Sequence, residues 1–236
     1  MNESNNRNSV SDKPALVITI DGPSGAGKGT LSQLLAKQLG FHFLDSGALY
    51  RLVALAAQRQ GIDIESEPAV AEVARTLNVR FDTAGEATRI LLDGEDVTGA
   101  IRAETVSMNA SVIAAYPTVR AALLARQRNF CQAPGLIADG RDMGTAVFPE
   151  ADIKFFLTAS AEARAERRYK QLVEKGEAVD LAALIQDIQE RDERDRTRKV
   201  SPLVPAADAY VIDSTVMTIN DVLNTMLQMI RQHCAI

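Results

Sequence analysis

The stretch Leu16–Thr30, LVITIDGPSGAGKGT, decides the fold of this chain. Its first five residues form a nearly unbroken apolar run, which indicates a strand covered by helices on both faces. After the loop, Leu31, Leu34, Leu35 and Leu39 recur at the spacing of one helix face. The sequence therefore predicts a strand, a glycine loop and a helix in this order, which is the beginning of a parallel α/β sheet.

The glycine loop has the features of a phosphate-binding loop. Its glycines permit backbone conformations that are closed to other residues, so that N–H groups can approach a phosphate. The helix that follows directs its free amides and its positive dipole end into the same space. Lys28 supplies a positive charge for the outer phosphates of a nucleoside triphosphate, and the Thr30 hydroxyl can reach a Mg²⁺ ion directly or through water. We therefore expect ATP to contact Gly22, Pro23, Ser24, Gly25, Ala26, Gly27, Lys28, Gly29 and Thr30.

The end of this loop, Gly27-Lys28-Gly29-Thr30, departs from the strict pattern G-x-x-x-x-G-K-[ST], because a glycine precedes the hydroxyl residue. The ending GKGT is typical of small nucleotide kinases. An ordinary glycine turn between a strand and a helix is the alternative, and the complete order of strand, loop, lysine, hydroxyl and helix argues against it.

The composition argues against several classes of protein. The 236 residues, 46% of them hydrophobic, suffice for one large α/β domain or for a core with a small added lobe. A net charge of −5 argues against nucleic acid as the main partner, because polyanion binding depends on neutralising phosphates. Residues 1–13 lack the apolar core of a signal peptide, and no run of 18 apolar residues occurs. We expect a flexible tail at 1–13 and no membrane partner. The only cysteines, Cys131 and Cys234, lie far apart, as expected of a reduced cytoplasmic protein.

Two further places in the chain are candidate anion sites. A short strand at 41–44 leads to Ser46, which is placed to cap a helix over about 47–60, with Arg51 in its second turn. A buried strand at 136–138 delivers the loop 139–145, which carries two aspartates, an arginine and two glycines. Ligands of open α/β sheets bind outside the carboxyl ends of the strands, so this loop is a strong site candidate.

Residues 78–100 predict a small antiparallel insert. Two β-like runs, 78–81 and 88–92, flank a turn at 83–85, and a further turn follows at 93–94. The segment Asp82-Thr83-Ala84-Gly85 also fits the D-x-x-G switch of GTP-binding proteins, which would indicate a regulatory switch instead of a kinase. Asp96-Val97-Thr98-Gly99 fits that short pattern equally well, and no N-K-x-D guanine-reading motif occurs in the chain. The switch interpretation is therefore weak.

The other segments alternate between helical and strand patterns. We predict helices over 68–77, over 101–130 with a break at Pro117, from about 180, and over 218–232, and strands at 153–157 and 209–212. A helix after 160 carries Arg164, Arg167 and Arg168 on one face. Like charges at this spacing repel, so either an external anion or a solvated face tempered by glutamates is indicated. The helix from 180 places Arg191, Asp195 and Arg198 on one face, and a self-paired solvent helix is the alternative there.

Taken together, these motifs make the chain resemble the bacterial-type cytidylate kinases, which are nucleoside monophosphate kinases. The motifs that carry the resemblance are TIDGPSGAGKGT at 19–30, LDSGALYR at 44–51, LIADGRDMGT at 136–145, ERDERDR at 190–196 and PLVPAADA at 202–209. Together with the insert they span nearly everything after residue 14. The first motif suits several kinase families, whereas the others in series are specific.

The resemblance implies an α/β fold with a doubly wound, five-stranded parallel sheet of the P-loop kinase type. It divides residues 14–236 into the core, a monophosphate-binding lobe at 46–116 that contains the insert, and a helical lid at 160–178. By resemblance, Ser111, Arg120 and Asp142 read the cytosine, Arg191 and Asp195 contact the sugar, and Arg51, Arg141 and Arg198 grip the acceptor phosphate. Ser46 joins this CMP-binding set. The lid arginines 164, 167 and 168 are expected to act in catalysis with Lys28, Arg141 and Arg198.

We therefore expect Mg²⁺-assisted, in-line transfer of the γ-phosphoryl group of ATP to CMP or dCMP. The acceptor phosphate has a second pKa of about 6 and arrives ionised, so no general base is needed. This agrees with a chain whose only histidines, His42 and His233, lie in no glycine loop. A cytoplasmic monomer that binds no nucleic acid is expected. The alternatives are a P-loop kinase for another monophosphate or a small metabolite, and a nucleotide-binding switch without an acceptor.

Overall fold

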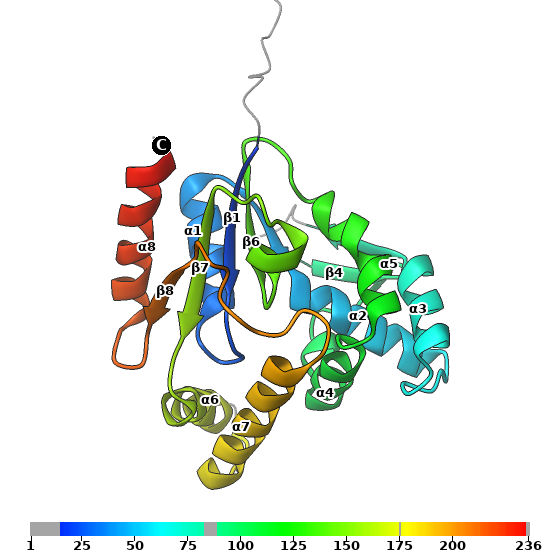
Figure 1. Cartoon of the computed structure of the whole chain (residues 1–236). Coiled ribbons are helices and arrows are strands. Elements are labelled where there is room, and N and C mark those ends of the chain that lie inside the picture. Colours follow the sequence, from blue (N-terminus) through cyan, green and yellow to red (C-terminus); the bar gives the residue numbers. More distant parts are fainter. Residues whose placement is uncertain (1–14, 83–88, 175, 235–236) are drawn as a thin grey trace, which may run out of the picture.

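A five-stranded parallel sheet forms the centre of the molecule (Figure 1). The computed structural model describes residues 15–82, 89–174 and 176–234, so the expected tail and the turn at 83–85 lie outside the described residues. The sheet has the order β2-β6-β1-β7-β8. Its strands are β1 (Leu16–Asp21), β2 (His42–Asp45), β6 (Gly135–Gly140), β7 (Ile153–Thr158) and β8 (Tyr210–Asp213). The predicted five-stranded parallel sheet is confirmed.

Helices cover both faces of this sheet, as the apolar strands require. The larger helices are α1 (Lys28–Leu39), α2 (Ser46–Arg59), α3 (Glu67–Thr76), α4 (Glu104–Ile113), α5 (Pro117–Arg128), α6 (Ala161–Glu174), α7 (Leu181–Thr197) and α8 (Ile219–Cys234). Helices α1 and α8 pack with Ile18, Ile137 and Phe155 on one face. On the other face, α2 to α5 pack with Leu136 and Ala138. Adjacent residues of β6 thus point into opposite cores, which is the two-residue period of a strand buried on both sides.

Pro117 separates α4 from α5 as predicted and occupies the first helical turn of α5. Backbone N–H groups in the first turn have no acceptor within the helix, so the missing N–H of proline costs no hydrogen bond there. The predicted cap of α2 is wrong. Asp45 is the N-cap, because its carboxylate accepts a hydrogen bond from Ala48 N at 2.8 Å, and Ser46 is the first helical residue. The Ser46 hydroxyl donates instead to Gln127 Oε1 at 2.7 Å in a buried contact with α5.

The insert is a three-stranded antiparallel sheet that packs against the core of the α2 to α5 lobe, with β4 drawn next to α5 (Figure 1). Its strands are β3 (Val79–Asp82), β4 (Arg89–Leu92) and β5 (Glu95–Asp96). The β3–β4 pair and the turn at Asp93–Gly94 are as predicted, and both turn residues have positive φ. The third strand was not predicted, because two exposed acidic residues carry no strand signal. A single 3-10 turn (Ala100–Arg102) leads from the insert to α4.

Strand β6 is longer than predicted, because Asp139 and Gly140 continue the pairing with β1. These two residues therefore lie in the strand and not in the loop that was expected at 139–145. The chain then makes a five-residue π-helical turn, Met143–Val147, next to the end of β1. No helix within the three described ranges is both long and apolar enough to cross a membrane.

Replacement of Gly22 tests how tightly the junction between β1 and the glycine loop is packed. The φ of Gly22 is 145°, and a Cβ there would stand 2.0 Å from the carbonyl oxygen of Leu157 in β7. We expect Gly22→Ala to lower the free energy of unfolding by at least about 2 kcal/mol more than Gly40→Ala, because overpacking adds to backbone strain. Gly40, at the C-cap of α1, also has positive φ (68°), but a Cβ would meet open space.

Urea unfolding of the two variants measures this difference. Equal losses of stability would show that only the backbone conformation matters at Gly22.

Candidate functional site

The glycine loop begins where β1 ends and closes on the first turn of α1. Gly25 and Gly27 have φ of 78° and 93°, the left-handed conformation in which only glycine is unstrained. Gly27 is the N-cap of α1, so the first free amides of the helix open onto the loop. The strand, loop and helix order that predicted a phosphate-binding loop is thus confirmed in the fold. That ATP binds at residues 22–30 stays a prediction.

Lys28 is buried at the start of α1, and its Nζ donates to the carbonyl oxygen of Pro23 at 2.8 Å. Two buried carboxyl groups act on it, Asp21 at the end of β1 and Asp139 near the end of β6. Burial lowers the pKa of the Lys28 ammonium and raises the pKa of the Asp139 carboxyl, while each charge favours the ionised form of the other. Burial also raises the pKa of Asp21 to about 7. The phosphate loop therefore adjoins a buried group of three charged side chains, Lys28, Asp21 and Asp139.

A second group of charges lies beside this loop. Arg141, directly after β6, donates from Nε to Asp195 Oδ2 in α7 at 2.9 Å. Arg191, one turn before Asp195 in α7, interacts electrostatically with both of them. Arg141 and Arg191 also lie near enough to Lys28 to lower the pKa of its ammonium, after the larger effect of burial. The end of β6 and the end of α7 thus meet next to the loop.

Arg51 and Arg198 complete this second group. Arg51 forms an ion pair with Asp45 at 2.8 Å and interacts with Arg191 and Asp139. Arg198, the C-cap of α7, donates from Nε to Ser201 O and interacts with Asp195. We name these residues the arginine cluster: Arg51, Arg141, Arg191, Asp195 and Arg198. The structure therefore brings together four of the arginines that were predicted to hold the acceptor.

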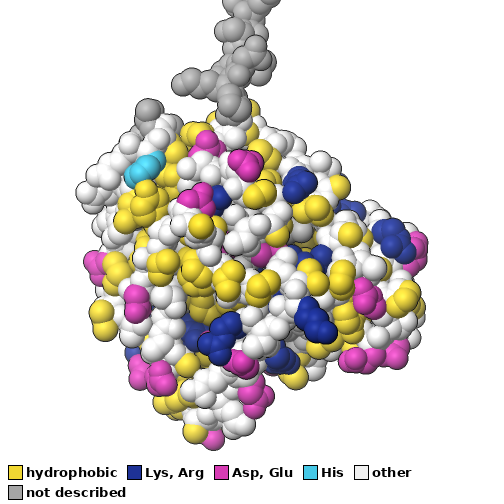
Figure 2. All heavy atoms as spheres, in the orientation of Figure 1, with side chains coloured by type: hydrophobic (Ala, Val, Ile, Leu, Met, Phe, Trp, Pro, Cys, Tyr) yellow, Lys and Arg dark blue, Asp and Glu magenta, His cyan; other side chains and the backbone are white. Residues whose placement is uncertain are grey.

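The arginine cluster has more hydrogen-bond donors than acceptors. Nε of Arg51, Nε of Arg191 and one terminal nitrogen of Arg198 are buried without a hydrogen-bond partner among the described residues. A buried donor without an acceptor costs roughly 1–3 kcal/mol. Lys and Arg side chains also gather around a hollow in the lower half of the face shown in Figure 2. An anion with several oxygens would satisfy these donors and neutralise the surplus charge.

Asp142, which is buried, and Arg120, which is half-buried, form an ion pair beside the cluster. The Arg120 guanidinium also lies 5.9 Å from the centre of the Tyr50 ring and donates to Ala114 O at 3.2 Å. Arg198 interacts with Tyr50, Arg120 and Asp142. The predicted base-reading residues Arg120 and Asp142 are thus adjacent to the arginine cluster. Ser111 lies half-buried in the last turn of α4, the helix that packs against α2.

The three arginines of α6 do not share one partner. Arg164 is buried and donates to Ser24 O of the phosphate loop and to the Asp192 carboxylate, each at 3.0 Å. Arg167 donates to the Ser214 carbonyl oxygen after β8, and Arg168 forms an exposed ion pair with Glu104 at 3.6 Å. Their mutual repulsion is therefore offset within the protein. The repulsion alone therefore does not require an external anion, and the role of these arginines toward ATP stays a prediction.

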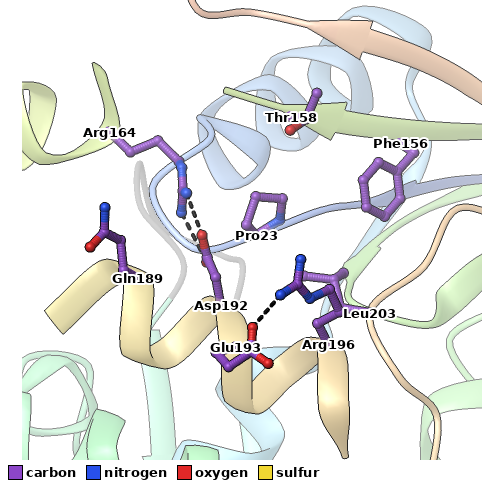
Figure 3. Close-up of a pocket in the computed structure, with 9 residues that line it drawn as sticks. All are labelled: Pro23, Phe156, Thr158, Arg164, Gln189, Asp192, Glu193, Arg196 and Leu203. Atoms are coloured by element: carbon purple, nitrogen blue, oxygen red, sulfur yellow. Dashed lines mark hydrogen bonds and ion pairs between the residues drawn. The ribbon is translucent and has the colours of Figure 1, made fainter. Parts of the chain in front are cut away.

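A pocket of about 380 Å³ lies between the phosphate loop, β7 and the α6–α7 pair (Figure 3). The residues that line it are Pro23, Phe156, Thr158, Arg164, Gln189, Asp192, Glu193, Arg196 and Leu203. Arg164 and Asp192 face each other across one side of it. Lys28 and the arginine cluster do not line this pocket, so it adjoins the outer side of the loop and is distinct from the predicted acceptor site.

The residues around the loop fit a magnesium ion that is held mainly by phosphates and water. Among the described residues, no three His, Cys, Asp or Glu side chains gather as a metal-binding group. Hard oxygens are nevertheless present: the Thr30 hydroxyl is exposed in the first turn of α1, and a carboxylate oxygen of Asp139 lies 3.5 Å from the point where a Cβ of Gly29 would stand. Mg²⁺ keeps several waters and takes one or two protein oxygens with substrate phosphates, which this set allows.

The sequence interpretation gave no role to Asp21, Asp139 or Asp192. A signal for Asp21 was present, because it is the one charged residue at the end of an apolar strand and precedes the loop directly. Asp139 was included only as part of a polar loop. Asp192 gave no signal, because its partner Arg164 is 28 residues away in the chain.

Comparison with known proteins identifies the family. The family profile described as cytidylate kinase matches residues 18–232. A cytidylate kinase of Aeromonas hydrophila is 60% identical over 213 residues, which is 90% of this chain and 93% of that protein. A cytidylate kinase of Vibrio parahaemolyticus is 58% identical over 219 residues, covering 93% and 97% of the two chains. A third, from Klebsiella pneumoniae, is 56% identical over 220 residues, again covering 93% and 97%.

The profile covers the phosphate loop, the insert, the arginine cluster and the α6–α7 pair in one continuous match. The relatives match over nearly their whole length. The resemblance seen in five separate motifs therefore holds for the chain as a whole, and this protein belongs to the cytidylate kinase family.

Proposed function

We propose that this chain transfers the γ-phosphoryl group of ATP to CMP or dCMP, giving ADP and CDP or dCDP. The observation that carries the proposal, beyond family membership, is the surplus of buried guanidinium donors beside a phosphate-binding loop. Two anion sites of different construction lie next to each other. One suits a polyphosphate at a helix N-terminus, and the other suits a phosphate monoester among arginines.

The acceptor binds in the arginine cluster. Arg51, Arg141 and Arg198 hold its phosphate, and Arg51 and Arg198 each bring one buried donor that has no hydrogen-bond partner among the described residues. Arg191 and Asp195 contact the sugar, while Ser111, Arg120 and Asp142 read the cytosine and Ser46 lines the site. Arg120 and the buried Asp142 are already paired, so they meet the base in a fixed arrangement with little loss of side-chain entropy.

The donor binds along residues 22–30. Lys28 exchanges its bond with Pro23 for the β- and γ-phosphates, and the amides of the loop and of α1 donate to their oxygens. Thr30 and Asp139 would hold a magnesium ion, directly or through water. When bound, Mg²⁺ neutralises charge on the phosphate oxygens. Lys28, Arg141 and Arg198 surround the transferred group, where charge spreads over its oxygens during the reaction.

No proton has to be removed from the acceptor, because a phosphate monoester is largely ionised at neutral pH. The work of the protein is to align two anionic oxygens and to exclude water. We propose that residues 160–178, which include α6, form the lid and that 46–116 form the acceptor lobe. Arg164, Arg167 and Arg168 then act after some of their present contacts are exchanged. The cytoplasmic location and the absence of a nucleic-acid partner stay predictions from the cysteine content and the net charge, and the monomeric state stays an expectation.

The substrate is tested by ADP release, measured by a coupled assay, with ATP, Mg²⁺ and a panel of acceptors. We expect CMP and dCMP to be turned over best, because Asp142 and Arg120 offer a fixed acceptor and donor pair for one base. The panel also contains UMP, AMP, GMP, shikimate and gluconate. These compounds distinguish a cytidylate kinase from a kinase that acts on another nucleotide or on a small metabolite. Equal or faster turnover of one of those compounds would overturn the assignment. Binding of ATP without turnover of any acceptor would indicate a switch.

Replacement of Lys28 tests the loop. We expect Lys28→Ala to lower kcat at least ~100-fold, because it removes one positioned charge from the transferred phosphoryl group. Lys37→Ala is the matched control, since Lys37 lies on the same helix but is exposed in its last turn. Steady-state rates at saturating ATP and CMP measure both variants. Near-normal turnover by Lys28→Ala would show that the loop takes no part in the reaction.

Replacement of Asp142 tests base reading. We expect Asp142→Ala to reduce the kcat/KM ratio of CMP over UMP by roughly 10- to 100-fold, the value of a hydrogen bond to a charged group. The KM for ATP should change much less. Asp208→Ala is the control, because it also deprives a buried cation, Lys154, of its carboxylate partner, but away from the cluster. A CMP preference unchanged in Asp142→Ala would contradict the assigned role.

A further inference from the structure

Asp21 connects the phosphate loop to the turn that carries Asp142. It is the last residue of β1, and its side chain is buried. Its Oδ1 accepts a hydrogen bond from Met143 N at 2.8 Å, and its Oδ2 accepts one from Gly144 N at 2.8 Å. Both carboxylate oxygens are thus engaged by consecutive backbone amides, 122 and 123 residues farther along the chain.

These two amides begin the π-helical turn Met143–Val147, whose preceding residue is Asp142. Two later amides of the turn, Ala146 N and Val147 N, donate to Asp142 O at 2.9 and 3.2 Å. The first amides of any helical turn have no such partner and need an external acceptor. Asp21 therefore acts as the cap of a turn that belongs to a distant part of the chain.

The turn has little room to move relative to β1. A Cβ on Gly144 would stand 2.9 Å from Thr19 Oγ1 in β1 and 3.1 Å from Cδ of Lys154 in β7. The backbone of the turn thus lies directly against the sheet at this point. Two hydrogen bonds at fixed length, together with this contact, set the distance between the end of β1 and the residue that precedes the turn.

We propose that Asp21 is a positioning residue that holds Asp142 in register with the phosphate loop. The loop begins at Gly22, one residue after Asp21, and the base-reading carboxylate of Asp142 stands one residue before the amides that Asp21 binds. One buried side chain thereby links the donor side to the acceptor side of the site. This inference rests on the proposed role of Asp142 in binding the acceptor base.

The variant Asp21→Asn has nearly the same shape but only one acceptor oxygen, and its amide group places a donor against a backbone N–H. One of the two hydrogen bonds is then lost and the turn shifts. We expect the KM and Kd for CMP to rise at least ~10-fold and the kcat/KM ratio of CMP over UMP to fall at least ~5-fold. The KM for ATP should rise less than the KM for CMP, because Asp21 acts on Lys28 only through its charge, and burial and the charges of Arg141 and Asp139 act on Lys28 more strongly.

Asp152→Asn is the matched control. Asp152 Oδ2 accepts a hydrogen bond from Val17 N at 2.7 Å at the opposite end of β1, so the same change from carboxylate to amide is made at a backbone N–H far from the cluster. Steady-state kinetics with CMP, UMP and ATP, calorimetric titration of CMP and thermal unfolding are measured for both variants. The control should leave the constants for CMP, UMP and ATP unchanged, because one acceptor oxygen suffices for its bond with Val17 N. The proposal is overturned if Asp21→Asn loses stability only, or if the constants for ATP and CMP worsen equally.

If Asp21→Asn does not fold, Asp21→Glu takes its place, because it keeps both oxygens but moves them by one methylene. A fall in the CMP preference of that variant supports the proposal, and an unchanged preference overturns it. Failure of the proposed function would appear in the wild-type protein as poor turnover of CMP. In that case the Kd for CMP, compared between wild type and variant, still decides whether Asp21 positions the acceptor site.

Discussion

The burial of charge at the carboxyl edge of the sheet is the constraint on which the rest of this structure depends. Lys28, Asp21 and Asp139 are withdrawn from water where β1 and β6 end, and buried charges are tolerated only when opposite charges or hydrogen bonds surround them. The ends of α7 and β6 therefore have to meet at this edge. Some of the guanidinium donors at this edge then find no acceptor in the part of the chain that the structure describes.

This constraint also explains how residues far apart in sequence form one site. Parallel strands bring their carboxyl ends to the same edge, so β1 and β6 deliver the loop at 22–30 and Arg141 side by side. Helix α7 adds Arg191 and Asp195 from outside the sheet, and α2 adds Arg51. The insert, β3 to β5, packs against the core of the helical lobe and takes no part in the central sheet.

The sequence was sufficient for the five strands and for most helices, because their apolar residues follow the period of the element that they form. It failed where tertiary contacts decide the outcome. Asp45 caps α2 because Ser46 is bound to Gln127, 81 residues away. For the site, the arginine cluster was predicted from motifs and came together. The partners of Arg164 and the capping role of Asp21 were not predictable, since both depend on contacts between distant segments.

The exposed ion pair between Arg168 of α6 and Glu104 of α4 has a consequence for nucleotide entry. It joins the proposed lid to the acceptor lobe at 3.6 Å, and both side chains are solvated. Such a pair contributes roughly 0–1 kcal/mol, close to thermal energy. This ion pair can therefore favour the approach of the lid to the acceptor lobe without slowing their separation. The products then leave at each turnover with little resistance from the pair.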